Sequence, residues 1–216
     1  MVAFSPDGEH VAAAGMCAGA TACTDASSLV WSVRTGRVLN TYRISMGAAS
    51  VSFSPDGAYV AFGSAGTLGR ASEVIVYSVA TGEMAKLRGS TDTISSVKFS
   101  PNGEFLAAAG NDRIIRLFEA NWQENGTLNW SSSPRRALTG HGNSVLSLAW
   151  SPDGKALLST GLQSSTGIAE MNLWAGEDSV TQMSLAQLGR VRSVRWSPDA
   201  KLLAVAGSSD IWSDGE

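Results

Sequence analysis

The chain has 216 residues, 44% apolar and 16% charged, an ordinary balance for a folded globular protein that excludes intrinsic disorder and collagen. Its apolar runs are short, such as residues 202–206, and fall far below the roughly 20 residues of a membrane-spanning helix, so no membrane insertion is expected. The net charge of -3 offers no bulk attraction to a phosphate backbone, so nucleic acid is not an expected partner.

Potential metal ligands are few, and no export signal is visible. The cysteines and histidines number two each and are too few for a tetrahedral zinc site without carboxylates or a second chain: Cys17, Cys23, His10 and His141. Free thiols are expected, and a small Cys17–Cys23 disulfide is the alternative in an oxidising compartment. The first residues lack the basic region and apolar core of a secretory signal, so we expect an intracellular location, cytoplasmic or nuclear. We also expect no cofactor.

One short motif occurs five times and divides the chain into repeats. The copies read FSPDG, FSPDG, FSPNG, WSPDG and WSPDA, and their prolines are residues 6, 55, 101, 152 and 198. The intervals of 49, 46, 51 and 46 residues indicate one supersecondary unit used repeatedly.

Each copy is preceded and followed by a predicted strand. Apolar residues alternate before the motif, which is the period of a strand with one buried face, at Val51/Phe53, Val97/Phe99, Leu148/Trp150 and Val194/Trp196. The Ser-Pro-Asp-Gly segment has the composition of a tight turn. A second strand is then predicted from the apolar residues at 11–14, 60–62, 106–109, 157–158 and 203–206, which closes a hairpin.

Two further strands complete each repeat. A third strand ending in an aromatic residue is predicted at 29–31, 74–77, 114–118 and 171–174, and a fourth at 38–42, 84–87, 136–138 and 180–185. Thr35-Gly36 and Thr81-Gly82 supply turns between them. Four antiparallel strands in about 48 residues predict an all-β fold in which four-stranded blades pack radially.

With these five repeats the whole chain resembles the WD-repeat β-propeller family. The resemblance implies one domain, 1–216, with repeats at approximately 1–44, 45–89, 90–141, 142–189 and 190–216, the last partial. It therefore implies four blades of four antiparallel strands plus two strands of a fifth, an incomplete ring. Two explanations stay open: a fragment of a larger propeller, or a small propeller completed by another chain. In both, the remaining blades come from the rest of a chain or from another chain.

In this family many blades contain a buried hydrogen-bond network of His, Ser or Thr, Asp and Trp. The resemblance assigns His141, Ser159 and Trp174 to such a network in the fourth repeat. Asp25 and Asp112 occupy the position of the Asp in other repeats, six residues before the third-strand aromatic residue, whereas Ile168 stands there before Trp174. No blade is then expected to have a complete network, and apolar packing is expected to supply most of the stability.

Loops on the propeller face that carries the first-strand entries are the expected places of partner binding, because function in this family is usually binding through loops. The candidates there are Arg113, Asn143, Arg190 and Arg192.

The third repeat contains an insertion with two tryptophans, Trp122 and Trp130. Asn125-Gly126 is a strong hairpin signal, which pairs Glu124 with Thr127 and Gln123 with Leu128. The tryptophans either anchor a partner on a protruding ribbon or fold back onto the blade edge.

Catalytic motifs are not found in the sequence. It contains no Gly-x-Ser-x-Gly elbow, P-loop, His-Glu-x-x-His or dinucleotide fingerprint, and neither catalysis nor a bound metal is expected. The resemblance favours a non-catalytic scaffold that mediates protein–protein interactions in a multiprotein assembly. The alternative is a regulatory or substrate-gating propeller attached to a catalytic domain outside this chain.

Overall fold

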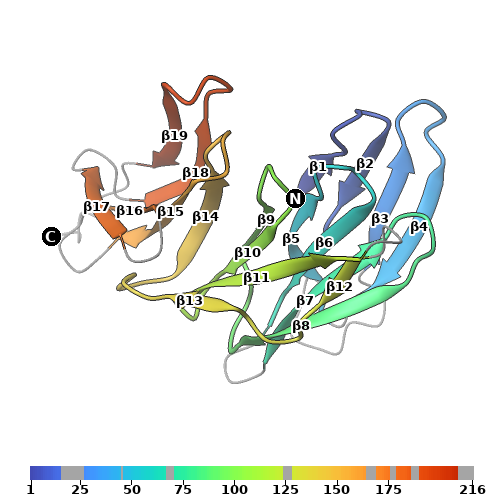
Figure 1. The fold of residues 1–216 in the computed structure, drawn as a ribbon, viewed down its shortest axis with the longest axis horizontal. Coiled ribbons are helices and arrows are strands. Elements are labelled where there is room, and N and C mark those ends of the chain that lie inside the picture. Colours follow the sequence, from blue (N-terminus) through green and yellow to red (C-terminus); the bar gives the residue numbers. More distant parts are fainter. Residues whose placement is uncertain are drawn as a thin grey trace, which may run out of the picture.

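The computed structural model describes residues 1–15, 27–44, 46–66, 71–123, 128–163, 169–175, 179–185 and 190–208, and within these ranges it consists of strands and contains no helix (Figure 1). The first blade is an antiparallel sheet in the order β1-β2-β3-β4, with bounds Val2–Phe4, His10–Ala13, Ser27–Ser32 and Val38–Arg43. The second is the sheet β5-β6-β7-β8, with bounds Ala48–Phe53, Tyr59–Ser64, Ser72–Ser78 and Met84–Ser90.

The third and fourth blades follow the same meander. Blade 3 comprises β9 (Ser96–Phe99), β10 (Phe105–Ala109), β11 (Ile115–Trp122) and β13 (Arg136–Leu138), and β12 (Leu128–Trp130) also pairs with β11. Blade 4 comprises β14 (Val145–Trp150), β15 (Ala156–Gln163), β16 (Ala169–Ala175) and β17 (Ser179–Leu185). The hairpin of β18 (Arg190–Trp196) and β19 (Leu203–Ser208) begins a fifth blade. The predicted count of four blades plus two strands is confirmed.

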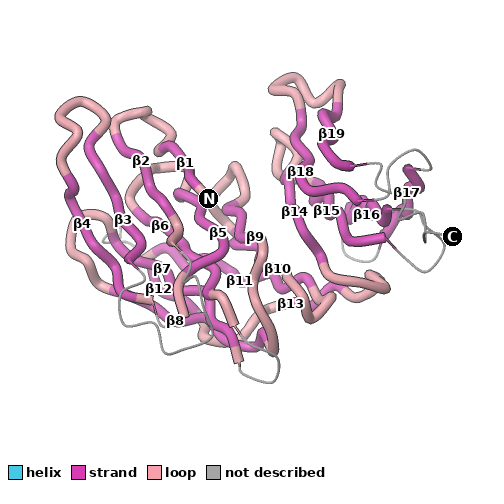
Figure 2. The backbone as a smooth tube through the Cα atoms, turned by 180° about the vertical axis from the view of Figure 1, so that it is seen from behind, coloured by secondary structure: helices cyan, strands magenta, loops and turns pink. Residues whose placement is uncertain are grey.

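The first strand of each blade contacts the first strand of the next, so β1, β5, β9, β14 and β18 form a row of inner strands. Figure 1 and the reverse view in Figure 2 show the blades arranged as an open arc, with blade 1 and the β18–β19 hairpin at its two ends. The predicted incomplete ring is therefore what the structure contains.

The Ser-Pro-Asp-Gly turn is held by one repeated set of hydrogen bonds. In blade 2 the Tyr59 amide donates to Ser54 Oγ at 2.9 Å, and Asp56 Oδ1 accepts from Ser54 Oγ and from the Ala58 amide. The same pattern recurs in every repeat, around Ser5, Ser54, Ser100, Ser151 and Ser197. Donation by the serine hydroxyl is the main cause that lowers the pKa of the aspartates at 7, 153 and 199. The motif is thus a turn that joins the first two strands of a blade.

The core lies between blades as a series of apolar clusters, one for each pair of neighbours. Phe53 of blade 2 packs against blade 1 and is 8% exposed, and Phe99 of blade 3 packs against blade 2 in the same way. Phe4 holds the equivalent position in blade 1 but is 65% exposed. The end face of blade 1 is therefore an apolar blade face that no described residue of the chain covers.

The hairpin in blade 3 forms, but its register differs from the prediction by one residue. Trp122 pairs with Leu128, and Ala120 pairs with Trp130, whereas the Asn-Gly turn predicts Gln123 opposite Leu128. A one-residue slip exchanges the two faces of a strand. The observed register places Trp130 opposite the buried Ala120, and the predicted one would have placed it opposite the exposed Asn121. Burial of the indole therefore outweighs the local turn preference.

Candidate functional site

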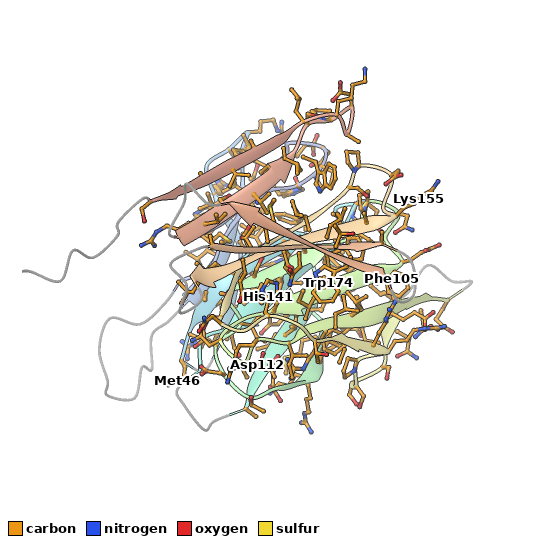
Figure 3. The ribbon with its side chains drawn as sticks, turned by 90° about the vertical axis from the view of Figure 1, so that its left-hand side faces the viewer. Met46, Phe105, Asp112, His141, Lys155 and Trp174 are labelled. Atoms are coloured by element: carbon orange, nitrogen blue, oxygen red, sulfur yellow. The ribbon has the colours of Figure 1, made fainter. Side chains whose placement is uncertain are left out.

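The three polar residues that the resemblance groups in the fourth repeat are joined in the structure. His141 Nε2 lies 2.7 Å from Ser159 Oγ, and the indole Nε1 of Trp174 donates to the same hydroxyl oxygen at 2.8 Å. The imidazole and the indole lie next to each other, and the partly buried indole packs against the apolar cluster between blades 3 and 4 (Figure 3). Ser159 and the ring of His141 are almost completely shielded from solvent.

A carboxylate completes this network, contrary to the expectation that no blade is complete. Glu170 Oε2 lies 3.2 Å from His141 Nδ1 and accepts a hydrogen bond of 3.0 Å from the Gly142 amide. Glu170 follows the expected position, Ile168, by two residues. Alternate residues of a strand share a face, so Glu170 lies on the same face of β16 as Trp174. The period of two was the signal that could have found it.

The network defines the protonation of the histidine. With Nδ1 donating to Glu170, Nε2 accepts from the Ser159 hydroxyl, whose oxygen accepts from Trp174; this tautomer is assigned from the hydrogen-bond pattern. Burial lowers the pKa of His141, and the neighbouring Glu170 opposes that effect. The imidazole is therefore neutral at pH 7 and links two strands of the blade and the loop that contains Gly142.

Blade 3 lacks this histidine and contains a buried ion pair instead. Arg116 Nη1 lies 2.7 Å from Asp112 Oδ2, and the two side chains are only 7% and 6% exposed. The Thr91 amide donates to the same carboxylate oxygen at 3.0 Å. The guanidinium also packs against Gly89, where an added Cβ would lie 3.2 Å from Arg116 Nε. Apolar packing is therefore not the only interaction that stabilises this blade: Asp112 was an expected network residue, but its partner Arg116 was not predicted.

Arg113 links the loops of blades 3 and 4. Its Nη1 donates to the Gly142 carbonyl oxygen at 3.1 Å, although its side chain is exposed to solvent. The residue has a φ of 69°, a left-handed conformation that is uncommon outside glycine. Beside it, Asn111 Nδ2 donates to Asp92 Oδ1 at 3.4 Å. We call Asp92, Asn111, Arg113, Gly142 and Asn143 the blade 3–4 loop surface.

The other predicted site residues are placed as follows. Arg192 is exposed on β18, the first strand of the fifth blade, and is not one of the residues of the blade 3–4 loop surface. The backbone of Arg190 pairs with Leu162 of β15 and Ser208 of β19. The side chains of Arg190 and Trp122 lie outside the described part of the structure, as do Asp25, Cys17 and Cys23.

Trp130 folds back onto its own blade. Its ring centroid lies 6.0 Å from that of Phe99, and it packs against the apolar cluster between blades 2 and 3. The amide of Leu128, on the same strand, donates to the hydroxyl of Tyr59 in blade 2 at 2.9 Å. The structure thus places this tryptophan at a blade edge and not on a protruding ribbon.

Neither a metal-binding cluster nor a membrane-spanning helix is found among the described residues. No group of three or more His, Cys, Asp or Glu residues in them lies close enough together to hold a metal ion. The described ranges contain no helix of the length and apolarity that crossing a bilayer requires.

Comparisons with known proteins agree with the fold. The family model of the WD domain, G-beta repeat, matches residues 82–119, 132–166 and 180–211. A chain of hydrazine synthase from Kuenenia stuttgartiensis superimposes with a TM-score of 0.78 and 18% identity. The match covers 95% of this chain and 54% of that one, so the chain spans about half the length of its structural neighbour.

No curated protein sequence matches significantly, whereas 1033 chains of solved structures do. A fold found so widely does not select a function. The three family matches, each of which runs from the fourth strand of one blade into the next blade, identify WD repeats between residues 82 and 211, and the four-stranded sheets of the chain have the β-propeller fold.

Proposed function

We propose that the chain is a non-catalytic scaffold that presents the blade 3–4 loop surface to protein partners in a multiprotein assembly. WD40 repeats generally serve protein interactions, and two of the matched segments contribute to this surface. The observation that carries the proposal is the state of Arg113, whose side chain is exposed yet held by a hydrogen bond across two blades. The proposal includes an intracellular location.

Preorganisation is what such a surface contributes to binding. A side chain that is already ordered loses less conformational entropy when a partner binds, and arginine is enriched at interface hot spots. The left-handed backbone of Arg113 costs roughly 1–2 kcal/mol in a non-glycine residue. Strain of this kind persists where the surrounding structure enforces it, and it often marks a functional site.

The serine, histidine and glutamate of blade 4 have the connectivity of a hydrolytic triad, but their environment supports a structural role. A catalytic serine must reach its substrate, whereas Ser159 is completely buried. Its oxygen also accepts the indole N–H of Trp174 and lies within hydrogen-bond distance of the histidine, so a substrate carbonyl has no access to it. The non-catalytic part of the proposal is based on this geometry.

The proposal also includes a further blade, from the rest of a longer chain or from another chain, that packs on the end face of blade 1. The interfaces of blade 2 with blade 1 and of blade 3 with blade 2 bury Phe53 and Phe99, the residues equivalent to Phe4, whereas Phe4 itself is exposed. Val2, which shares a strand face with Phe4, extends this exposed apolar surface, whose contact with water is unfavourable. Sedimentation velocity of the chain and of Phe4→Ser tests whether this face causes association.

Two substitutions on the loop surface test the scaffold proposal. Arg113→Glu reverses the charge, and Asn111→Arg adds bulk without touching the contact to Gly142. Arg37→Glu, in an exposed turn of blade 1, is the matched control. Quantitative mass spectrometry of proteins that co-purify with the tagged chain should show the same partners lost in both surface variants and retained in the control. Identical partner sets in all variants that keep the thermal midpoint would contradict the proposal.

A further inference from the structure

The outer strand of blade 1, β4, has a free edge. It lies at the end of its sheet, and no strand in the described ranges pairs with its outer side. Figures 1 and 2 both show β4 at the outer margin of the arc, away from the row of inner strands. A free strand edge presents unpaired backbone N–H and C=O groups, to which another strand can bind.

The corresponding strand of blade 2, β8, is bound by a segment of blade 3. The Arg88 amide donates to the Ser132 carbonyl at 2.7 Å, and Ser132 lies between β12 and β13. Arg43 is the counterpart of Arg88 in blade 1, because each arginine directly follows a buried residue of its outer strand. These buried residues are Tyr42 and Leu87. An outer strand of this fold therefore binds a segment from beyond its own sheet, and the described part of the chain places no such segment on β4.

The outer edges of blades 2 and 3 are neutralised by acidic residues of their own third strands. In blade 2, Lys86 Nζ lies 3.5 Å and Arg88 Nε 3.1 Å from the carboxylate oxygens of Glu73. In blade 3, Arg135 Nη1 lies 2.6 Å from Glu119 Oε2. Such exposed pairs contribute little to stability, but they leave the edge without unpaired positive charge.

Blade 1 lacks both carboxylates. Glu73 and Glu119 stand four residues before and one residue after the third-strand aromatic residue, and serines 27 and 32 occupy these positions around Trp31. The acidic residues in the described part of blade 1, Asp7 and Glu9, lie in the turn between β1 and β2. The arginines of the β4 edge are exposed, and within the described ranges none of them forms an ion pair: Arg34, Arg37 and Arg43.

The same strand exposes apolar side chains. Val38 is 49% and Leu39 46% exposed. Val38 pairs with Trp31 as Met84 pairs with Tyr77, and Met84 remains 58% exposed although blade 1 packs beside blade 2. A further blade on the end face of blade 1 would therefore leave Val38 accessible.

We propose that residues 37–43, which we call the β4 edge, bind an extended acidic segment of a partner protein as an added β-strand. Backbone hydrogen bonds to β4 hold the segment, and Val38 and Leu39 contact its apolar side chains. Its carboxylates take the place that Glu73 and Glu119 have in the other blades. This surface is separate from the blade 3–4 loop surface and does not depend on it.

The charge of the β4 edge selects the occupant. A second copy of the chain paired along the same edge would bring its arginines close to those of the first, and like charges on adjacent strands repel. Arg37 directly precedes β4 and Arg43 ends it, so the two cations flank a strand of six residues, about 20 Å long. A complementary segment is therefore short and has an acidic residue near each end.

Fluorescence anisotropy with the labelled peptide Glu-Val-Thr-Val-Thr-Val-Glu, at low ionic strength, measures this binding. The same peptide with lysine in place of both glutamates should bind at least about tenfold more weakly, because its charges are repelled. A peptide with proline in place of both threonines keeps the charges but lacks two N–H donors. It should also bind at least about tenfold more weakly, since proline cannot join a strand ladder.

Blade 2 supplies matched control variants for the charges. Arg37→Gln/Arg43→Gln should weaken binding of the acidic peptide about tenfold, as expected for loss of two exposed ion pairs. Lys86→Gln/Arg88→Gln changes the net charge equally, but its cations are already paired with Glu73. It should leave the affinity unchanged. All four side chains are exposed, so the thermal midpoint should stay the same in both variants.

The apolar contact and the position of the peptide are tested in the same way. Val38→Ser should weaken binding, whereas Met84→Ser, at the equivalent exposed position of blade 2, should not. Amide hydrogen exchange of β4 should slow when the acidic peptide is added. Asn111→Arg should bind the peptide like the unmodified chain, and Arg37→Glu should bind it less, so this proposal and the scaffold proposal can fail independently.

Four outcomes would overturn the proposal. They are absence of binding of the acidic peptide, equal binding of the lysine or proline peptide, an equal loss of affinity in the blade 2 controls, and unchanged exchange of the β4 amides. Sedimentation velocity at the same concentrations covers the remaining occupant. A dimer that protects the β4 amides without peptide would assign the edge to a second copy of the chain.

Discussion

Glu170 Oε2 lies 3.2 Å from His141 Nδ1 and also accepts a hydrogen bond from the neighbouring Gly142 amide. This one side chain, from the third strand of blade 4, therefore fixes both the buried histidine and Gly142, which belongs to the blade 3–4 loop surface. Arg113 donates to the carbonyl of the same glycine. The buried network and the exposed surface therefore meet at one residue, and changes in the network should be transmitted to the loops.

Glu170→Ala should destabilise the chain by about 1–3 kcal/mol, because the histidine and the Gly142 amide each lose a hydrogen-bond acceptor. Urea unfolding followed by tryptophan fluorescence measures the change. Glu9→Ala, at an exposed turn, is the control and should change stability by less than about 0.5 kcal/mol. Equal effects of the two substitutions would show that the carboxylate has no structural role.

The chain should lose stability as the pH falls from 7 towards 5. Burial lowers the pKa of His141 below its ordinary 6.5, so the unfolded state binds more protons than the folded state in the window between the two values. The contribution of the neutral histidine is therefore complete above about pH 6.5 and decreases as the pH falls towards the folded-state pKa. Equilibrium unfolding at a series of pH values measures the free energy of unfolding, which should depend less steeply on pH in His141→Gln than in the unmodified chain. An unchanged pH dependence in this variant would show that other groups cause the effect.

Ala200→Gly should stabilise the chain by about 1 kcal/mol. Ala200 stands where the other four repeats have glycine, and its φ of 58° is close to the 72° and 73° of those glycines. A left-handed conformation is unfavourable for alanine and free for glycine. Gly154→Ala, the reverse change in blade 4, should destabilise by a similar amount in the same thermal unfolding assay. The prediction requires that Ala200→Gly raises the thermal midpoint and that Gly154→Ala lowers it.

The buried pair of blade 3 should behave as one unit. Asp112→Ala leaves the guanidinium of Arg116 buried without its partner and should cost about 3–5 kcal/mol. The double variant Asp112→Ala/Arg116→Met removes both charges and should be more stable than the single one. A double-mutant cycle with Arg116→Met gives the coupling energy, and additive effects would contradict a direct interaction.

Local chemistry was enough to predict the architecture. The five turn motifs, their spacing and the alternation around them depend on interactions within a few residues, and each repeat forms the predicted strands. The resemblance to the WD-repeat family placed His141, Ser159 and Trp174 in one network by their positions in a repeat, and the structure shows them hydrogen-bonded. Repetition makes such prediction robust, because one unit is seen five times.

Only the tertiary structure decided which side chains replace those missing from the pattern. Glu170 reaches His141 from a position two residues away from the expected one, and Arg116 fills the interior of the blade that lacks the histidine. The register of the β11–β12 hairpin likewise follows the burial of Trp130 against Phe99 and not the turn signal. The sequence alone therefore determined the repeat and its strands, which depend on near neighbours. The polar partners and the register depend on contacts between strands and blades, where space and burial outweigh local preference.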